Sequence, residues 1–146
     1  MFELLIGTGG WAYFQVPGLN QLEAYSSVFN FVEVNSTFYE MPNLHRVKSW
    51  RRRVPLDFTF SVRCHKDMTH VHQLEPIEEV FNAFDSMKEI CTILASRFLV
   101  IVTPSVLNFN KRKTESIKNF FESIDLNNIT FVWEIRRRRG DPLPNH

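Results

Sequence analysis

Hydrophobic and polar residues follow two periods along the chain, and the clearest strand pattern begins the stretch Phe31 to Pro42, FVEVNSTFYEMP. Because side chains alternate along a strand, Val32 and Val34 share one side. Glu33 and Asn35 share the other. Burying an unpaired carboxylate is costly, so Glu33 requires water, a cation or a hydrogen-bond partner. We therefore expect one side of this strand to be apolar and the other to face solvent or a polar site.

The same two periods predict the other elements. Apolar runs indicate four further strands, which are Phe2 to Ile6, Asp57 to Arg63, Phe98 to Val102 and Ile129 to Ile135. Apolar stripes at helical spacing indicate four helices, which contain Leu22 to Phe29, Leu44 to Trp50, Ile77 to Leu94 and Ile117 to Ile124. Since repeated strand–helix–strand units give parallel sheets, we expect an α/β fold with about five parallel strands that alternate with helices.

Polar motifs follow the predicted strands. They are Gly7 to Trp11, Glu33 to Tyr39, His65 to His72, Thr103 to Ser105, and the pair Glu134 and Arg136. In parallel sheets, ligands bind where the strands end, and in a (β/α)₈ barrel these ends converge on one mouth. Scattered surface polarity would not select the same end of every strand, so we expect a binding site there.

Composition narrows the class of protein. With 146 residues, 44% of them hydrophobic and 14% aromatic, the chain suits a single domain over residues 1–146 rather than a disordered segment. The formal net charge of +1 gives no indication of a nucleic-acid or membrane partner. No apolar run approaches the roughly 20 residues of a membrane span and no signal peptide is evident, so we expect a cytoplasmic protein. Cys64 and Cys91 lie far apart, which favours two reduced thiols, with Cys91 in the core.

Three local clusters each allow a functional and a structural interpretation. The glycines after Ile6 would let a ligand approach the backbone, but GTGG is neither a P-loop nor a dinucleotide fingerprint. His65, His70 and His72 could exchange protons or bind a metal, and they could equally be exposed loop residues. Arg51 to Arg53 favour a solvated surface, because consecutive helical residues are spread around the axis.

Longer motifs connect the chain with a known family. They are Ile6-Gly7-Thr8-x-Gly10-Trp11-x-Tyr13, FVEVNSTFY at 31–39 followed by Pro42, Phe60-Ser61-Val62 with Thr69-His70, and Phe131-x-Trp133-Glu134-Ile135-Arg136. In this order they resemble the YecE-like family, domain of unknown function 72. The resemblance implies a TIM-like barrel whose mouth holds three pairs, which are Glu33 with Asn35, Thr69 with His70, and Glu134 with Arg136. It implies no reaction, because the activity of the family is not established.

Several positions depart from the family pattern. Gly9 stands where serine is common, Arg63 where lysine is frequent, and Val102 where glutamine often stands. After Arg136, the run RRRG at 137–140 replaces the usual continuation. Since a barrel of this type takes about 250 residues, we expect the N-terminal part of a (β/α)₈ barrel. A fragment, a truncated gene product and a protein that needs a partner chain all fit this expectation.

The first functional hypothesis is an enzyme that acts on a small polar or phosphorylated substrate. Catalysis would rest on Glu33 as general base, His70 as general acid or base, and Glu134 as the second carboxylate. The residues expected to bind the substrate are Gly7, Trp11, Asn35, Tyr39 and Arg136. Glu33, Glu134 and a histidine would also suit a divalent metal ion, should the enzyme use one.

Other interpretations stay open. A non-catalytic module for nucleic acid or another anion is one alternative, although the balanced net charge argues against it. Its cations would be Arg51 to Arg53, Arg63, Lys66 and Arg136 to Arg139, and its stacking faces would be Trp11, Phe38, Tyr39 and Trp133. The chain could also be an inactive, truncated remnant. Five strands cannot close a barrel, so a homo-oligomer in which a second copy completes the open sheet is a further expectation.

Overall fold

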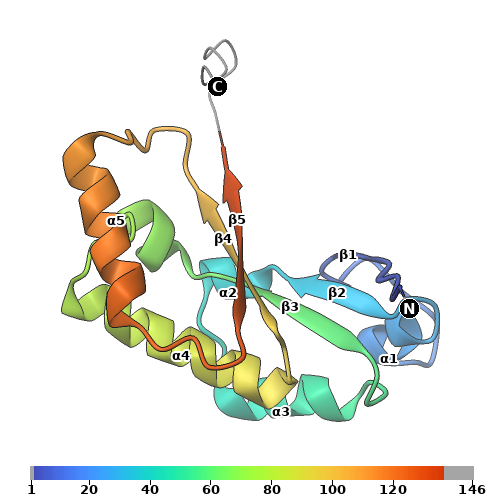
Figure 1. The fold of residues 1–146 in the computed structure, drawn as a ribbon. Helices are drawn as coiled ribbons and strands as arrows, with labels where there is room; N and C mark the ends of the chain where they lie inside the picture. The colour runs from blue at the N-terminus through green and yellow to red at the C-terminus, as the bar shows by residue number, and fades with distance from the viewer. Residues whose placement is uncertain (1, 137–146) are drawn as a thin grey trace.

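A computed structural model, which describes residues 2–136, contains one sheet of five parallel strands that alternate with helices (Figure 1). The strands are β1 (Gly7–Gly9), β2 (Phe31–Val34), β3 (Thr59–Arg63), β4 (Phe98–Thr103) and β5 (Thr130–Ile135). The helices are α1 (Gln21–Ser26), α2 (Ser36–Tyr39), α3 (Leu44–Arg52), α4 (Glu78–Leu94), α5 (Lys111–Ser123) and the π-helix η1 (Asp67–Val71). The expected α/β fold with five parallel strands is confirmed.

The strands lie side by side in the order in which they occur along the chain. Each of the four neighbouring pairs, from β1 with β2 to β4 with β5, is parallel. β1 and β5 form the two edges of the sheet, so the sheet is open within residues 2–136. Successive parallel strands joined by helices are the arrangement of an incomplete (β/α) barrel.

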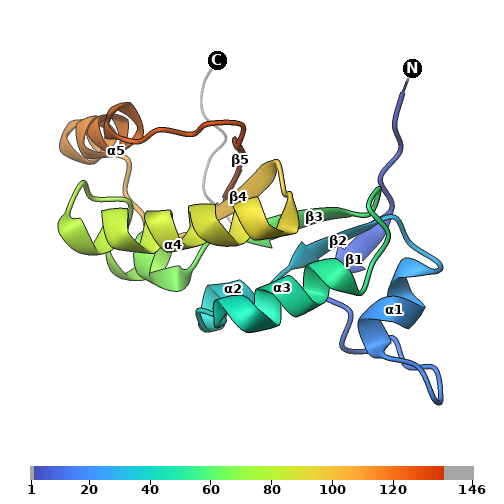
Figure 2. The same cartoon turned by 90° about the horizontal axis from the view of Figure 1, so that it is seen from below.

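The hydrophobic core lies between the sheet and the helices. Figure 2 shows α3 and α4 along one face of the sheet. Alternate residues of the central strands supply the apolar surface of this face and have almost no solvent exposure; they are Val32, Val34, Phe60, Val62, Leu99 and Ile101. The opposite face, called the inner face below, bears Glu33, Ser61 and Arg63. No helix among residues 2–136 has the length and apolar character needed to cross a membrane.

The first strand differs from the prediction. The sequence predicts a strand at Phe2 to Ile6, whereas the structure places β1 at Gly7–Gly9. The hydroxyl of Tyr25 accepts a hydrogen bond from the backbone N–H of Thr8 (2.7 Å) and donates one to the carbonyl of Phe31 (2.8 Å). These two hydrogen bonds hold the glycine segment beside β2. The pattern of apolar residues along the chain gives no sign of such a contact between distant residues.

The stretch that begins with β2 continues as a helical turn rather than as a strand. β2 ends at Val34 and α2 follows within two residues. Thr37 in α2 is fully buried, and its Oγ1 lies within hydrogen-bond distance of the carbonyls of Val34 (2.9 Å) and Arg63 (2.7 Å). Thr37 therefore ties together the ends of β2 and β3, where two of the polar motifs lie.

Arg51 corrects the expectation that Arg51 to Arg53 form a solvated surface. Its Nη1 donates hydrogen bonds to the carbonyls of Phe58 (3.0 Å) and Leu94 (3.3 Å), and its Nη2 donates to that of Pro55. Backbone carbonyls at element ends require such donors when water is excluded. Arg51 thus joins α3 to the start of β3 and the end of α4.

Both cysteines are buried and unpaired. Burial raises the pKa of the two thiols, that of Cys91 to about 12, so both stay protonated at neutral pH. The expectation of reduced thiols, with Cys91 in the core, is confirmed.

Candidate functional site

The register of the sheet brings polar side chains together on the inner face. Residues paired across neighbouring strands point to the same side, and Gly9 pairs with Glu33, which pairs with Ser61. Arg63 lies two residues beyond Ser61 in β3 and therefore projects from the same face. The predicted alternation along β2 is confirmed, because Val32 and Val34 are buried while Glu33 is partly exposed.

Glu33 is the half-buried carboxyl at the centre of this group. Burial raises the pKa of Glu33, the positive charge of Arg63 lowers it, and the negative charge of Glu134 raises it. Among residues 2–136, the ion pairs do not include Glu33 or Arg63. Glu33 is therefore influenced by charges from β3 and β5 without being neutralised by a direct partner.

The charge of Arg63 acts on both Glu33 and His70, lowering the pKa of each. Its guanidinium carbon lies 4.5 Å from the ring centre of Phe38, which belongs to α2, so the cation is stacked on an aromatic face. Its Nε is buried and has no hydrogen-bond partner in the part of the chain that the structure describes. A stacked guanidinium is well fixed in position, and one of its donors is unused.

His70 is carried by the π-helix η1. The wide turn is closed by a hydrogen bond from the N–H of His72 to the carbonyl of Asp67 (2.9 Å). Nδ1 of His70 lies 2.9 Å from Oγ1 of Thr69, and the imidazole packs edge-on against Phe38 with ring centres 4.9 Å apart. Burial lowers the pKa of His70, and nearby arginines lower it further. His70 is therefore neutral at neutral pH.

Glu134 lies in β5, and Arg136 directly follows this strand. Arg136 Nε donates to Glu134 Oε1 over 3.0 Å, and both side chains are about half exposed. Their charges still reach the other groups, since Glu134 raises the pKa of Glu33 and Arg136 lowers that of His70. The structure thus brings the three predicted catalytic residues and Arg136 into one electrostatic neighbourhood.

Asn35 and Gly9 are fitted to each other. A Cβ atom on Gly9 would lie 2.4 Å from Nδ2 of Asn35, a distance that real Cβ atoms do not show. The absent side chain at Gly9 therefore makes room for the Asn35 amide. Oδ1 of Asn35 is buried and, like Oγ of Ser61, has no hydrogen-bond partner within residues 2–136.

The other residues expected to bind substrate have structural contacts of their own. A Cβ on Gly7 would lie 1.8 Å from the carbonyl oxygen of Phe31, so strand packing alone requires glycine there. Trp11 packs edge-on against Trp50 with ring centres 5.4 Å apart. Tyr39 is 67% exposed at the end of α2, and its ring packs edge-on against Phe38 with ring centres 4.9 Å apart. Substrate binding by Gly7, Trp11 and Tyr39 stays a prediction.

A metal centre is not assembled from the expected ligands. Among residues 2–136, no three His, Cys, Asp or Glu side chains come close enough together to hold a metal ion. Of the clustered histidines, His65 faces Asp67 with Nδ1 and Oδ2 3.4 Å apart, while His70 faces Thr69. Within residues 2–136, Glu33, Glu134 and a histidine therefore do not form the expected three-ligand set. The run Arg137 to Gly140 lies outside the described residues.

The catalytic and substrate-binding residues expected from the sequence did not include Ser61, Phe38 or Arg63; Phe38 and Arg63 were expected only as a stacking face and a cation of the alternative binding module. Ser61 is adjacent to Glu33 only through strand register, and Phe38 reaches Arg63 only because α2 turns back over the end of β3. The available signal was the alternation of β3, which places Ser61 and Arg63 on one side of the strand, away from Phe60 and Val62.

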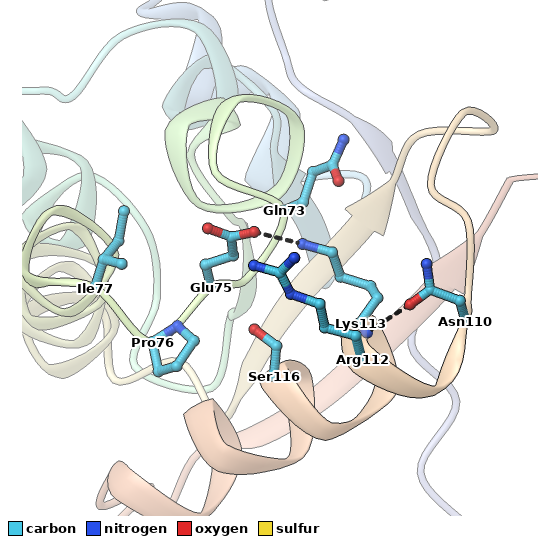
Figure 3. A pocket seen from close by; sticks show the side chains of 8 residues that line it. All are labelled: Gln73, Glu75, Pro76, Ile77, Asn110, Arg112, Lys113 and Ser116. Carbon is cyan, nitrogen blue, oxygen red and sulfur yellow. Dashed lines mark hydrogen bonds and ion pairs between the residues drawn. The ribbon is translucent and has the colours of Figure 1, made fainter.

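A separate hollow of about 430 Å³ lies between the segment before α4 and the beginning of α5 (Figure 3). Lys113 Nζ donates to Glu75 Oε1 over 2.9 Å across it, and Arg112 points toward the same carboxylate. These cations lower the pKa of Glu75. None of the residues that line the hollow belongs to the inner-face group, which consists of Glu33, Asn35, Ser61 and Arg63. The charges of Glu75 and Lys113 are already paired with each other.

Comparisons with known proteins give the family and the fold. Residues 5–139 match the model of a family described as "Protein of unknown function DUF72". The UPF0759 protein YunF of Bacillus subtilis (strain 168) is 32% identical over 92 residues, which cover 56% of this chain and 32% of that relative. The UPF0759 protein YecE of Escherichia coli (strain K12) is 31% identical over 67 residues, which cover 46% of this chain and 25% of that relative. The match thus spans a third or less of each of these two relatives.

Two solved structures have a similar fold. A DUF72 family protein from Thermotoga maritima MSB8 aligns with a TM-score of 0.68 at 21% identity, covering 90% of this chain and 55% of that one. A DUF72 family protein from Enterococcus faecalis V583 aligns with a TM-score of 0.65 at 18% identity, covering 90% and 51%. This chain therefore corresponds to about half of each of those folds.

Proposed function

The chain belongs to the DUF72 family of proteins of unknown function, and from this premise we propose that it is an enzyme that transfers protons to and from a small polar or phosphorylated substrate. One observation carries the proposal. The pKa of Glu33 is raised and that of His70 is lowered, and both groups lie near Arg63. Titratable groups whose pKa values are moved in opposite senses within one site are typical of general acid–base catalysis.

Glu33, His70 and Glu134 would have different roles in the proton transfer. Glu33 is a stronger base than an ordinary glutamate because its pKa is raised, and it would take the proton from the substrate. His70 has Nδ1 engaged with Thr69, which leaves Nε2 as the ring nitrogen that would return a proton or stabilise a developing charge. Burial is the main cause of the raised pKa of Glu33, and Glu134, paired with Arg136, would raise that pKa further as the second carboxylate of the site.

A turnover survey tests this function. The protein is incubated with a panel of hydroxylated and phosphorylated metabolites in D₂O, and conversion or deuterium incorporation is followed by ¹H and ³¹P NMR. We expect at least one compound to react, and Glu33→Gln to lower its rate about 100-fold or more, since general acid–base groups contribute roughly 10² to 10⁴-fold. His70→Gln should lower it as well.

Matched controls separate this effect from general damage to the fold. Glu40→Gln and His45→Gln make the same chemical changes at exposed positions outside the inner-face group, and both should keep the parent rate. Turnover that is equal in Glu33→Gln and Glu40→Gln would remove Glu33 from the chemistry and contradict the proposal.

A non-catalytic anion-binding module is the second candidate. It is favoured by Arg63, whose guanidinium is stacked on Phe38 with an unused donor. Nucleic acid as the anion draws no support from Arg51, which is occupied by backbone carbonyls. Saturable binding of a panel compound with no conversion or exchange would favour this module over the enzyme.

A further inference from the structure

Three buried polar atoms on the inner face have no hydrogen-bond partner among residues 2–136. Resting on the proposed function, we propose that the substrate bears an oxyanion, a carboxylate or a phosphate, next to a hydroxyl group. Arg63 binds the oxyanion, while Asn35 and Ser61 bind the hydroxyl. This assigns three residues to substrate recognition and leaves proton transfer to Glu33 and His70.

The first support is the lack of partners. Oδ1 of Asn35, Oγ of Ser61 and Nε of Arg63 are each buried and without a hydrogen bond among residues 2–136. Ser61 as a whole is only 2% exposed. An unsatisfied buried polar group is destabilising, so three such groups on one face are unfavourable unless something else binds them.

The second support is that the three atoms belong to one face. Ser61 is the register partner of Glu33, and Arg63 follows on the same side of β3. The amide of Asn35 lies where a side chain of Gly9 would project, and Gly9 pairs with Glu33. The residues that carry the unpaired atoms therefore flank Glu33, with Asn35 on the side of β1 and Ser61 and Arg63 on the side of β3.

The chemistry of these atoms sets the class of ligand. An arginine Nε can only donate, and the guanidinium geometry fits the oxygens of a carboxylate or phosphate. Oδ1 of Asn35 only accepts, so it requires a donor such as a hydroxyl. A serine hydroxyl does either. A ligand that satisfies all three therefore carries an oxyanion and a hydroxyl close together.

Other arginines of the chain show what an occupied guanidinium looks like. Arg51 donates from its two Nη atoms to backbone carbonyls, although its Nε, like that of Arg63, is buried without a partner among residues 2–136. Arg53 pairs with Glu23 over 2.8 Å. Arg136 pairs with Glu134. Arg63 is stacked on Phe38 and forms no ion pair with any residue between 2 and 136. Its positive charge could therefore pair with a bound anion.

Direct binding measurements test the inference without requiring turnover. Isothermal titration calorimetry and ¹H–¹⁵N NMR shifts are recorded with four probes, which are glycerol 3-phosphate, glycerate, inorganic phosphate and glycerol. We expect glycerol 3-phosphate or glycerate to bind about tenfold more tightly than inorganic phosphate, and glycerol not to bind, because the hydroxyl adds to the charged contact. The better of the first two identifies phosphate or carboxylate as the oxyanion.

Variants connect this binding to the named residues. Arg63→Met should weaken the better probe by about tenfold or more, Arg63→Lys less so, and the surface control Arg53→Met should have no effect. Ser61→Ala should weaken binding while leaving the melting temperature unchanged or higher, because it removes an unsatisfied buried hydroxyl. A lower melting temperature of Ser61→Ala with unchanged affinity would make Ser61 structural and overturn its assignment.

The failure of this inference can be told apart from failure of the proposed function. If no probe binds, or if Arg63→Met binds as the parent does, the oxyanion site is overturned, and the turnover survey still decides the roles of Glu33 and His70. Tight binding of a single-stranded oligonucleotide with weak binding of every small probe would also overturn it. Binding that depends on Arg63 supports it whether or not the bound compound reacts.

Discussion

Glu33 shows how a single residue acquires an unusual pKa. Burial between strands raises it, and the neighbouring charges of Arg63 and Glu134 act in opposite senses. The sequence could predict that a carboxylate in an apolar strand needs a polar environment. It could not predict the balance of charges, because Arg63 and Glu134 come from β3 and β5 and meet Glu33 only through the register of the sheet.

Glu33→Gln should change how stability depends on pH. Because the folded pKa is raised, the folded state holds the proton more firmly than the unfolded state, so the parent protein loses stability as pH rises from the unfolded pKa through the folded pKa. A glutamine side chain does not titrate, so the variant should gain stability relative to the parent over that interval. Urea unfolding at pH 4 to 8 measures the difference, with Glu40→Gln as the control. A difference that does not vary with pH would contradict the raised pKa.

The pKa of His70 should depend on the charge of Arg63. Burial and the positive charges of Arg63 and Arg136 lower its pKa, so removal of the first charge in Arg63→Met should raise that pKa toward the ordinary value of histidine. Titration of the imidazole ¹H and ¹³C NMR signals measures the change. The control is Arg53→Met, which removes a surface arginine that is paired with Glu23. An unchanged pKa in Arg63→Met would mean that the two side chains are not neighbours.

At the scale of elements, periodic segments were predicted and short irregular ones were not. α4 and β3 were expected within a few residues of their bounds, since each has a clear apolar period. α2 and η1 span too few residues to show a period. Local hydrogen bonds, such as those of the Thr37 hydroxyl, decide their geometry. The site depends on these short elements, because they carry Phe38 and His70.

The end of α4 offers a stability prediction at this scale. Ala95 follows the helix with φ of 52° and ψ of 35°, a left-handed conformation in which a Cβ is unfavourable. Ala95→Gly should therefore raise the free energy of unfolding by about 1 kcal/mol. Ala83→Gly, the same change inside α4, should lower it by about 1 kcal/mol. Urea unfolding of both variants measures this, and equal signs for the two would contradict the left-handed end of the helix.

At the scale of the whole molecule, the sheet has two open edges, and apolar side chains lie on one of them. In β5, Val132 is 45% exposed and Ile135 is 53% exposed. Parallel sheets are usually covered on both faces, and exposed edge strands readily pair with other chains. The sequence predicted the alternation of strands and helices, but which surfaces stay uncovered depends on how the five strands are arranged in space.

We expect the chain to associate with a second copy through this uncovered surface. Native mass spectrometry at micromolar concentration should show a dimer, and Val132→Lys should shift it to monomer, because a charge at a buried contact is costly. Lys48→Val is a control at an exposed position of α3 and should leave the mass unchanged. A monomeric parent protein would contradict this expectation.

Glu33 and the proposed oxyanion site around Arg63 should form one functional unit, and the pKa of Glu33 is the measurement that decides this. The side-chain carboxyl ¹³C signal is titrated by NMR with and without saturating glycerol 3-phosphate. We predict a pKa above the ordinary glutamate value in the free protein and a further rise when the anion is bound, because a second negative charge beside Glu33 favours its protonated form. An ordinary or lowered pKa of Glu33 that the anion leaves unchanged would mean that Glu33 and the oxyanion site do not act together.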